Sequence, residues 1–446
     1  DQRRRTGAWV YASSPGNVAS IEGTHAAVEA LHAWGDLDHL DAAGRLAWAD
    51  TLAAWQDPVT GCFTGPYVRP PDHPTWAAPA CSHPWLHMQD HLIACLVPTL
   101  LLLGGQLRTP LSEGSLSGRF LDADFLRRYL DDRDWSGYRG DGDHLRHSPW
   151  WLGNEFWYPG AILWAVAVTE AGTPAAARAE DLLHHVWFAW HDRHLNAFGF
   201  WDGRHDGPAR ERWWGRLADD PAGLSWPTTR DEWHWLADQI MGGAHQLWLY
   251  EALDHPISDP LRQRQTDVLL GLQHRLDHRF GLEGPDTPSS NSNDCTDVDC
   301  LTLLASNFHR QDHRRAEIQA ACERAVGSIL RDRRDEDLLF RAQPDQAWTH
   351  HATSYECYSP ADQANLHQQA FSLWAVRAGL SVLDRADNPL VADFLAYPFR
   401  NPDTHWLHVP SSRINQTGEG EKGREDRAAV PGSVEPQLDA NALRCP

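Results

Sequence analysis

Helical periodicity governs most of this 446-residue chain, and the alternation typical of strands is scarce. Apolar side chains recur at helical spacing over residues 42–55, and Asp57-Pro58 ends that stretch. In the turn that follows, residues 56–63 (QDPVTGCF), Gly61 accepts a positive φ and Phe63 returns to the core. The sequence therefore predicts an all-α protein built from helical hairpins.

Related turns recur along the chain at intervals of roughly 60 to 80 residues. Weaker versions of the pattern lie at residues 134–138, 194–200, 273–282 and 332–340. One hairpin per interval gives on the order of ten to twelve helices, which can close into a ring if each pair buries its face on the next. We therefore expect an α/α toroid, a double-layered barrel, over residues 1–410.

The expected helices end at glycine, proline or polar breaks. They cover residues 26–34, 42–55, 85–103, 153–172, 175–190, 233–253, 260–274, 294–306, 314–331 and 360–384. Residues 411–446 are polar, rich in Gly and Glu, and lack apolar periodicity. This tail is predicted to be disordered and to carry no chemistry.

Charge and composition limit the classes of function. With 61 acidic and 39 basic residues the formal net charge is -22, which disfavours binding to nucleic acid or anionic membranes. The only lysine, Lys422, lies in the tail, so lysine-dependent chemistry such as a Walker phosphate loop or a buried Schiff base is excluded. The longest apolar run, residues 92–103, contains Pro98 and is too short to span a bilayer. These features favour a cytoplasmic protein that acts on a small molecule.

Two segments carry a resemblance to a known superfamily. Residues 23–35 (GTHAAVEALHAWG), followed one helix later by the turn at 56–63, resemble the repeat of the terpenoid cyclase and protein prenyltransferase toroids. The resemblance implies a central cavity lined by aromatic residues. Such toroids also include carbohydrate lyases and non-catalytic binding proteins, so the fold alone leaves the reaction open.

The densest acidic motif is Asp294-Cys295-Thr296-Asp297-Val298-Asp299-Cys300, at the start of an expected helix. Acids at a helix start complement the helix dipole, which is one explanation of the motif. The other comes from its resemblance to the Asp-x-Asp-Asp motif of class II terpenoid cyclases, from which it departs at Cys300. That resemblance implies that Asp299 protonates an alkene or epoxide. A cluster with Asp297 and Asp294 would help Asp299 to keep its proton.

Several patterns could also hold a metal. His87, His91 and Cys95 recur every fourth residue and would share one face of a helix. Cys295 or Cys300 could hold zinc together with His350 or His351. Ordinary structural roles explain these residues better, so no metal is assigned and the cofactor is left open.

Two other segments supply candidate acids and bases. His245 follows Gly242-Gly243, a pair that costs helix stability and indicates close helix packing or access to a ligand. His351 and Tyr355 are close enough in sequence to act as an acid/base pair.

Aromatic residues are abundant, with 23 Trp, and they suit either carbocations or sugar rings. The expected substrate-contacting residues are Trp157, Tyr158, Glu155, Asp90 and Trp235. Packing between helices remains the alternative for each tryptophan.

Three functional hypotheses follow. The first is a toroid enzyme of the terpenoid cyclase or prenyltransferase type, with Asp299 as general acid assisted by Asp297 and Asp294. The second is a carbohydrate-active lyase or hydrolase using His245, His351 or Tyr355. The third is a non-catalytic toroidal binding protein in which the acidic motif only caps a helix.

Overall fold

The prediction of an all-α protein is confirmed by the computed structural model. The structure describes residues 9–12, 19–34, 37–65, 84–131, 149–196, 198–201, 229–281, 294–331 and 366–383. Within these ranges extended structure is limited to two short antiparallel strands, β1 (Tyr11–Ala12) and β2 (Ala19–Ser20). The expected tail at 411–446 lies outside the described residues.

The helices follow the expected order. They are α2 (Ile21–Trp34), η1 (Leu37–His39), α3 (Ala42–Ala53), α4 (Pro84–Leu102), η3 (Leu111–Glu113), η4 (Ser117–Leu121), α5 (Ala123–Asp131), α7 (Pro149–Thr169), α8 (Pro174–Leu182), the π-helical η6 (Leu183–Phe188), α9 (Ala189–His194), α11 (Arg230–Ala252), α12 (Asp259–Gly271), α13 (Asp294–Arg310), α14 (Arg315–Arg331) and α15 (Leu366–Ser381). The segment η3–η4–α5 was not predicted. Its helices are short, although Phe125, Leu126, Tyr129 and Leu130 of α5 do recur at helical spacing and pack on the core.

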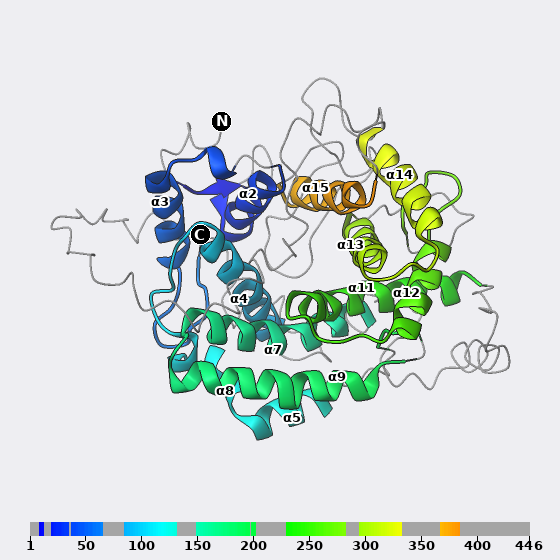
Figure 1. Cartoon of the computed structure of the whole chain (residues 1–446). Coiled ribbons are helices and arrows are strands. Elements are labelled where there is room, and N and C mark those ends of the chain that lie inside the picture. Colours follow the sequence, from blue (N-terminus) through cyan, green and yellow to red (C-terminus); the bar gives the residue numbers. More distant parts are fainter. Residues whose placement is uncertain are drawn as a thin grey trace.

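In the part of the chain that the structure describes, six helices contact one another in a closed order. α2 contacts α4, α4 contacts α7, α7 contacts α11, α11 contacts α13, α13 contacts α15, and α15 returns to α2. Other helices pack against this series from its periphery: α3 on α4, α8 on α7, α12 on α13, and α14 on α13 and α15 (Figure 1). In the hairpins α3–α4 and α12–α13, a peripheral helix therefore leads into one of the six.

The predicted turn is found twice with the same geometry. An antiparallel bridge joins Gln56 to Phe63, and another joins Gln273 to Phe280. Gly61 has φ 74°, and His278 occupies the equivalent position with φ 63°. A Cβ at Gly61 would lie 2.0 Å from the Ser117 hydroxyl oxygen, so glycine is required in the first turn.

The other three related turns are only partly described. At residues 194–200 the Asn196 N–H donates to the Phe200 carbonyl at 2.7 Å, and Gly199 has φ 77°, so this segment is also a turn. The segments 134–138 and 332–340 lie outside the described residues.

The paired glycines of α11 serve close helix packing. A Cβ at Gly153 of α7 would lie 2.2 Å from the Gly242 Cα, so the two backbones approach too closely for any side chain. The Gln246 amide also donates to the Gly153 carbonyl at 2.6 Å across the same contact. Of the two interpretations of Gly242-Gly243, close packing is therefore the one that applies to Gly242.

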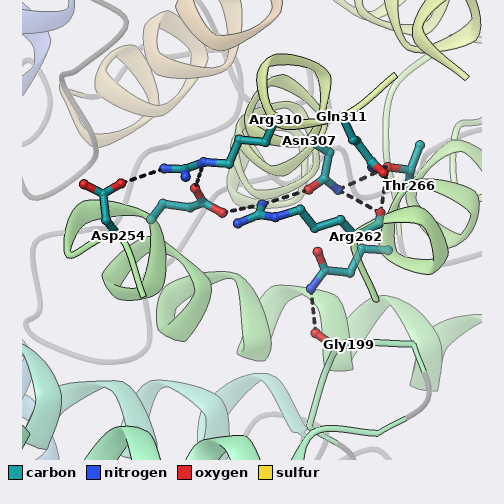
Figure 2. Close-up of polar contacts among 9 residues, drawn as sticks. Gly199, Asp254, Arg262, Thr266, Asn307, Arg310 and Gln311 are labelled. Atoms are coloured by element: carbon teal, nitrogen blue, oxygen red, sulfur yellow. Dashed lines mark hydrogen bonds and ion pairs between the residues drawn. The ribbon is translucent and has the colours of Figure 1, made fainter. Parts of the chain in front are cut away.

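A buried polar network joins the ends of α11 and α13 to α12 (Figure 2). Glu251 accepts from Arg262 at 2.6 Å and pairs with Arg310 at 2.6 Å, while Arg310 also reaches Asp254 at 3.1 Å. Asn307 accepts from Arg262 at 3.3 Å and donates to the Thr266 hydroxyl at 3.2 Å. The network fixes the C-terminal half of α13 relative to its neighbours.

Candidate functional site

One narrow stripe of α13 differs from the rest of that helix. Cys295, Thr302 and Ser306 are partly exposed, whereas every other residue from 296 to 308 is buried. With Asp299 they stand at i, i+4, i+7 and i+11, positions that fall on one face of an α-helix. We call these four residues the α13 stripe.

Asp299 is the buried acid of this stripe. It is 1% exposed, and neither carboxyl oxygen has a hydrogen-bond partner. Burial raises its pKa well above the usual value, with no charged neighbour contributing to the shift. Burial therefore favours the protonated form of the Asp299 carboxyl, the form that can donate a proton.

Asp297 does not join Asp299 in an acidic cluster. Its carboxylate accepts from the Arg279 guanidinium at 2.5 Å and from the Phe280 N–H at 2.9 Å. Two positions along a helix correspond to a rotation of about 200°, so Asp297 and Asp299 point to opposite sides of α13. Burial raises the pKa of Asp297, while Arg279 and the Phe280 N–H oppose that shift.

The bond from the Phe280 N–H to Asp297 has a counterpart in the turn at 56–63. Gln89 of α4 accepts from the Phe63 N–H at 2.9 Å and donates to the Phe63 carbonyl at 3.1 Å. Asp297 reproduces the first of these bonds by accepting from the Phe280 N–H at 2.9 Å, so it anchors the turn. The sequence analysis expected Asp297 to help Asp299 keep its proton. In the structure, burial alone raises the pKa of Asp299.

The other residues of the acidic motif that the sequence analysis singled out are Asp294, Cys295 and Cys300. Asp294 is the first residue of α13, and its side chain lies outside the described ones. Cys300 is fully buried, and burial raises its pKa well above the usual value, which opposes the thiolate form that zinc binds. Cys300 is a free thiol.

His91 lies in a small polar group between α4 and α7. Its Nδ1 lies 3.4 Å from the Tyr158 hydroxyl, and its Nε2 lies 3.7 Å from Cys95 Sγ. The side chain of His87, the third member of the sequence pattern, is outside the described ones. Within the ranges that the structure describes, no group of three or more His, Cys, Asp or Glu side chains could hold a metal ion.

Asp90 and Glu155 are both buried acids. Asp90 forms a short ion pair with Arg119 of η4, which gives it a structural role. Glu155 lies on α7 beside Phe156, whose carbonyl accepts from the Trp187 indole at 2.8 Å. Neither lies on the α13 stripe.

His245 is held between two tryptophans. Its ring centroid is 5.3 Å from that of Trp157 and 4.4 Å from that of Trp248. Nδ1 donates to the Met241 carbonyl at 2.9 Å, and burial lowers the pKa of His245 to about 4. The imidazole is therefore neutral at pH 7. α11 meets α13 one turn before His245, where the Thr296 hydroxyl donates to the sulfur of Met241 at 3.4 Å.

Three other expected residues are not placed. His351 and Tyr355 lie outside the described residues. Trp235 belongs to α11, but its side chain is not among those described. The structure thus places Asp299 apart from Asp297, and it places Trp157 against His245.

Thr302 and Ser306 were missed by the sequence analysis. Counting helical positions onward from Asp299 would have found them, because i+3 and i+7 share its face. Hydroxyl residues are so common in helices that the spacing gave no signal without the exposure pattern.

The buried carboxyl of Asp299 predicts a pH dependence of stability. An unfolded aspartate has a pKa of about 3.9, whereas folded Asp299 keeps its proton to higher pH, so the folded state binds one more proton. The contribution of Asp299 to the free energy of unfolding should fall as pH rises from about 4 toward the raised pKa, by up to about 1.4 kcal/mol per pH unit.

Asp299→Asn isolates this effect because the amide does not titrate. Urea unfolding of both proteins across this pH range should show the variant gaining stability relative to the wild type as pH rises. A difference that stays constant with pH would mean that Asp299 titrates normally in the folded protein.

Among the described residues, no helix is long and apolar enough to cross a membrane. Comparison of the chain with protein-family models, curated proteins and solved structures gives no match.

Proposed function

We propose that this protein is an α/α-toroid enzyme of the terpenoid cyclase type, in which Asp299 is the general acid. The single observation that carries the proposal is the buried carboxyl of Asp299, whose oxygens have no hydrogen-bond partner and whose pKa is raised by burial. Structural carboxyls in protein interiors are hydrogen-bonded or ion-paired, as Asp297 and Asp90 are. Carboxylic acids kept neutral by an apolar site can act as proton donors.

The contacts of the helices support the toroid. Six helices that contact one another in a closed order, with the others outside them, are what a two-layered ring requires. The stripe on α13 fits an inward face, because Cys295, Thr302 and Ser306 are partly exposed while the other residues from 296 to 308 are buried.

The chemistry of Asp299 favours an epoxide over a simple alkene. Burial makes this carboxyl a weaker acid, so it needs a more basic acceptor, and an epoxide oxygen is more basic than a carbon–carbon double bond. The proton passes from the carboxyl to the epoxide oxygen as a C–O bond breaks, and the π electrons of the substrate attack the carbon released. Asp299 is left as a carboxylate and regains a proton from the final cation or from solvent.

The carbohydrate hypothesis has less support. His245 is its only candidate base among the described residues, and that ring donates to a backbone carbonyl, packs against two tryptophans and has a pKa of about 4. Such a histidine is a weak base at pH 7.

Asp299→Asn tests the proposed function directly. The protein should convert a linear isoprenoid epoxide into cyclic products, detected by mass spectrometry. The variant should lose about 10²- to 10⁴-fold in kcat, the contribution typical of a positioned general acid. The matched control is Asp267→Asn, on peripheral α12, whose carboxylate pairs with Arg314 at 2.9 Å. It should keep wild-type turnover; retention of turnover by Asp299→Asn would contradict the proposal.

A further inference from the structure

Ser306 is a second polar group on the α13 stripe whose oxygen atom is buried. Its hydroxyl has no hydrogen-bond partner in the structure, although the residue as a whole is partly exposed. Buried hydroxyls in native proteins are nearly always satisfied, so a polar atom outside the protein's own hydrogen bonds is expected there. Ser306 thus shares this property with Asp299.

Helix geometry puts both groups on the same side of α13. A separation of seven residues returns to within about 20° of the starting direction and advances about 10 Å along the axis. Thr302 lies between them on the same face and is itself partly exposed. One extended molecule lying along the helix could reach both Asp299 and Ser306.

We infer that Ser306 is a specificity-determining residue, which selects substrates carrying a second neutral oxygen function about 10 Å from the atom that Asp299 protonates. The part of this inference that concerns protonation by Asp299 rests on the proposed function. Recognition by Ser306 requires only that the substrate binds. The net charge of -22 disfavours an anionic group at this second point. A hydroxyl, ether or carbonyl oxygen fits the single donor and the two lone pairs of serine.

Paired probes test this inference. The probes are the terminal epoxides of geraniol and of farnesol, each compared with the same epoxide in which the hydroxyl is replaced by hydrogen. Affinity is measured from the quenching of tryptophan fluorescence in the Asp299→Asn background, where the epoxide is not opened. With Ser306 present, one of the two alcohols should bind about three- to ten-fold more tightly than its deoxy counterpart, the value of one neutral hydrogen bond.

Ser306→Ala should abolish this preference while leaving the affinity for the deoxy epoxide unchanged. Ser328→Ala, at a buried serine of peripheral α14, is the matched control and should keep the preference. Equal binding of alcohol and deoxy epoxide with Ser306 present, or a preference that survives Ser306→Ala, would overturn the inference. Loss of the preference in Ser306→Ala without any turnover by the wild type would support Ser306 and refute the proposed reaction.

Discussion

Asp297→Ala should lower the free energy of unfolding by about 3–5 kcal/mol, the cost of removing one partner from a buried ion pair. Asp297 and Arg279 are both almost fully buried, so the substitution leaves the guanidinium without its carboxylate in the interior. It also leaves the Phe280 N–H without an acceptor in the turn before α13. Urea unfolding measures the loss as a lower midpoint with an unchanged slope.

The test of this explanation is a double variant. Arg279→Ala in the Asp297→Ala background removes the guanidinium that has lost this carboxylate and should restore part of the lost stability. The matched control is Asp312→Ala, whose pairing with Arg315 is at the surface with the carboxylate 95% exposed, and it should change stability by less than about 1 kcal/mol. Additive losses in the double variant would show that Asp297 does not act by neutralising Arg279.

The acidic motif shows why the sequence predicted the fold better than the site. Helical periodicity and the turn at 56–63 depend on local chemistry, so the helices and the equivalent turn at 273–280 could be identified from sequence. Asp297 and Asp299 are alike in sequence and differ only in the direction of their side chains. That direction is set by the packing of α13 against the turn at 273–280, which puts Arg279 beside Asp297 and leaves Asp299 on the opposite face.

The same reasoning applies to the histidines and glycines. His245 followed Gly242-Gly243, and both close packing and ligand access were consistent with that pattern. Which of the two applies depends on the residues of α7 at this contact. Gly153 lies against the backbone of α11 at Gly242, and Trp157 lies against the His245 imidazole. Contacts between helices that are far apart in sequence carry no local signal.

Glu251→Gln should be as damaging as Asp297→Ala, with an expected loss of about 3–5 kcal/mol in the free energy of unfolding. The carboxylate of Glu251 pairs with Arg262, and both side chains are only 4% exposed. Its second oxygen pairs with Arg310, which is partly exposed and also reaches Asp254 (Figure 2). Neutralising Glu251 therefore removes the carboxylate partner of the buried Arg262 guanidinium. It also weakens the contact of Glu251 with Arg310.

The asymmetry of this network gives the comparison that checks the prediction. Arg262→Met should cost less than Glu251→Gln, because Glu251 keeps Arg310 and methionine fills the space of the arginine stem. Asp254→Asn should cost less than about 1 kcal/mol, since that carboxylate is 69% exposed. In urea unfolding, Glu251→Gln should lose the most stability, Arg262→Met less, and Asp254→Asn the least. A loss in Asp254→Asn equal to that in Glu251→Gln would contradict the prediction. Glu251 lies on α11 and pairs with Arg310 at the end of α13 opposite the acidic motif. Under the proposed function, the folded fraction of Glu251→Gln should therefore still open an epoxide through Asp299.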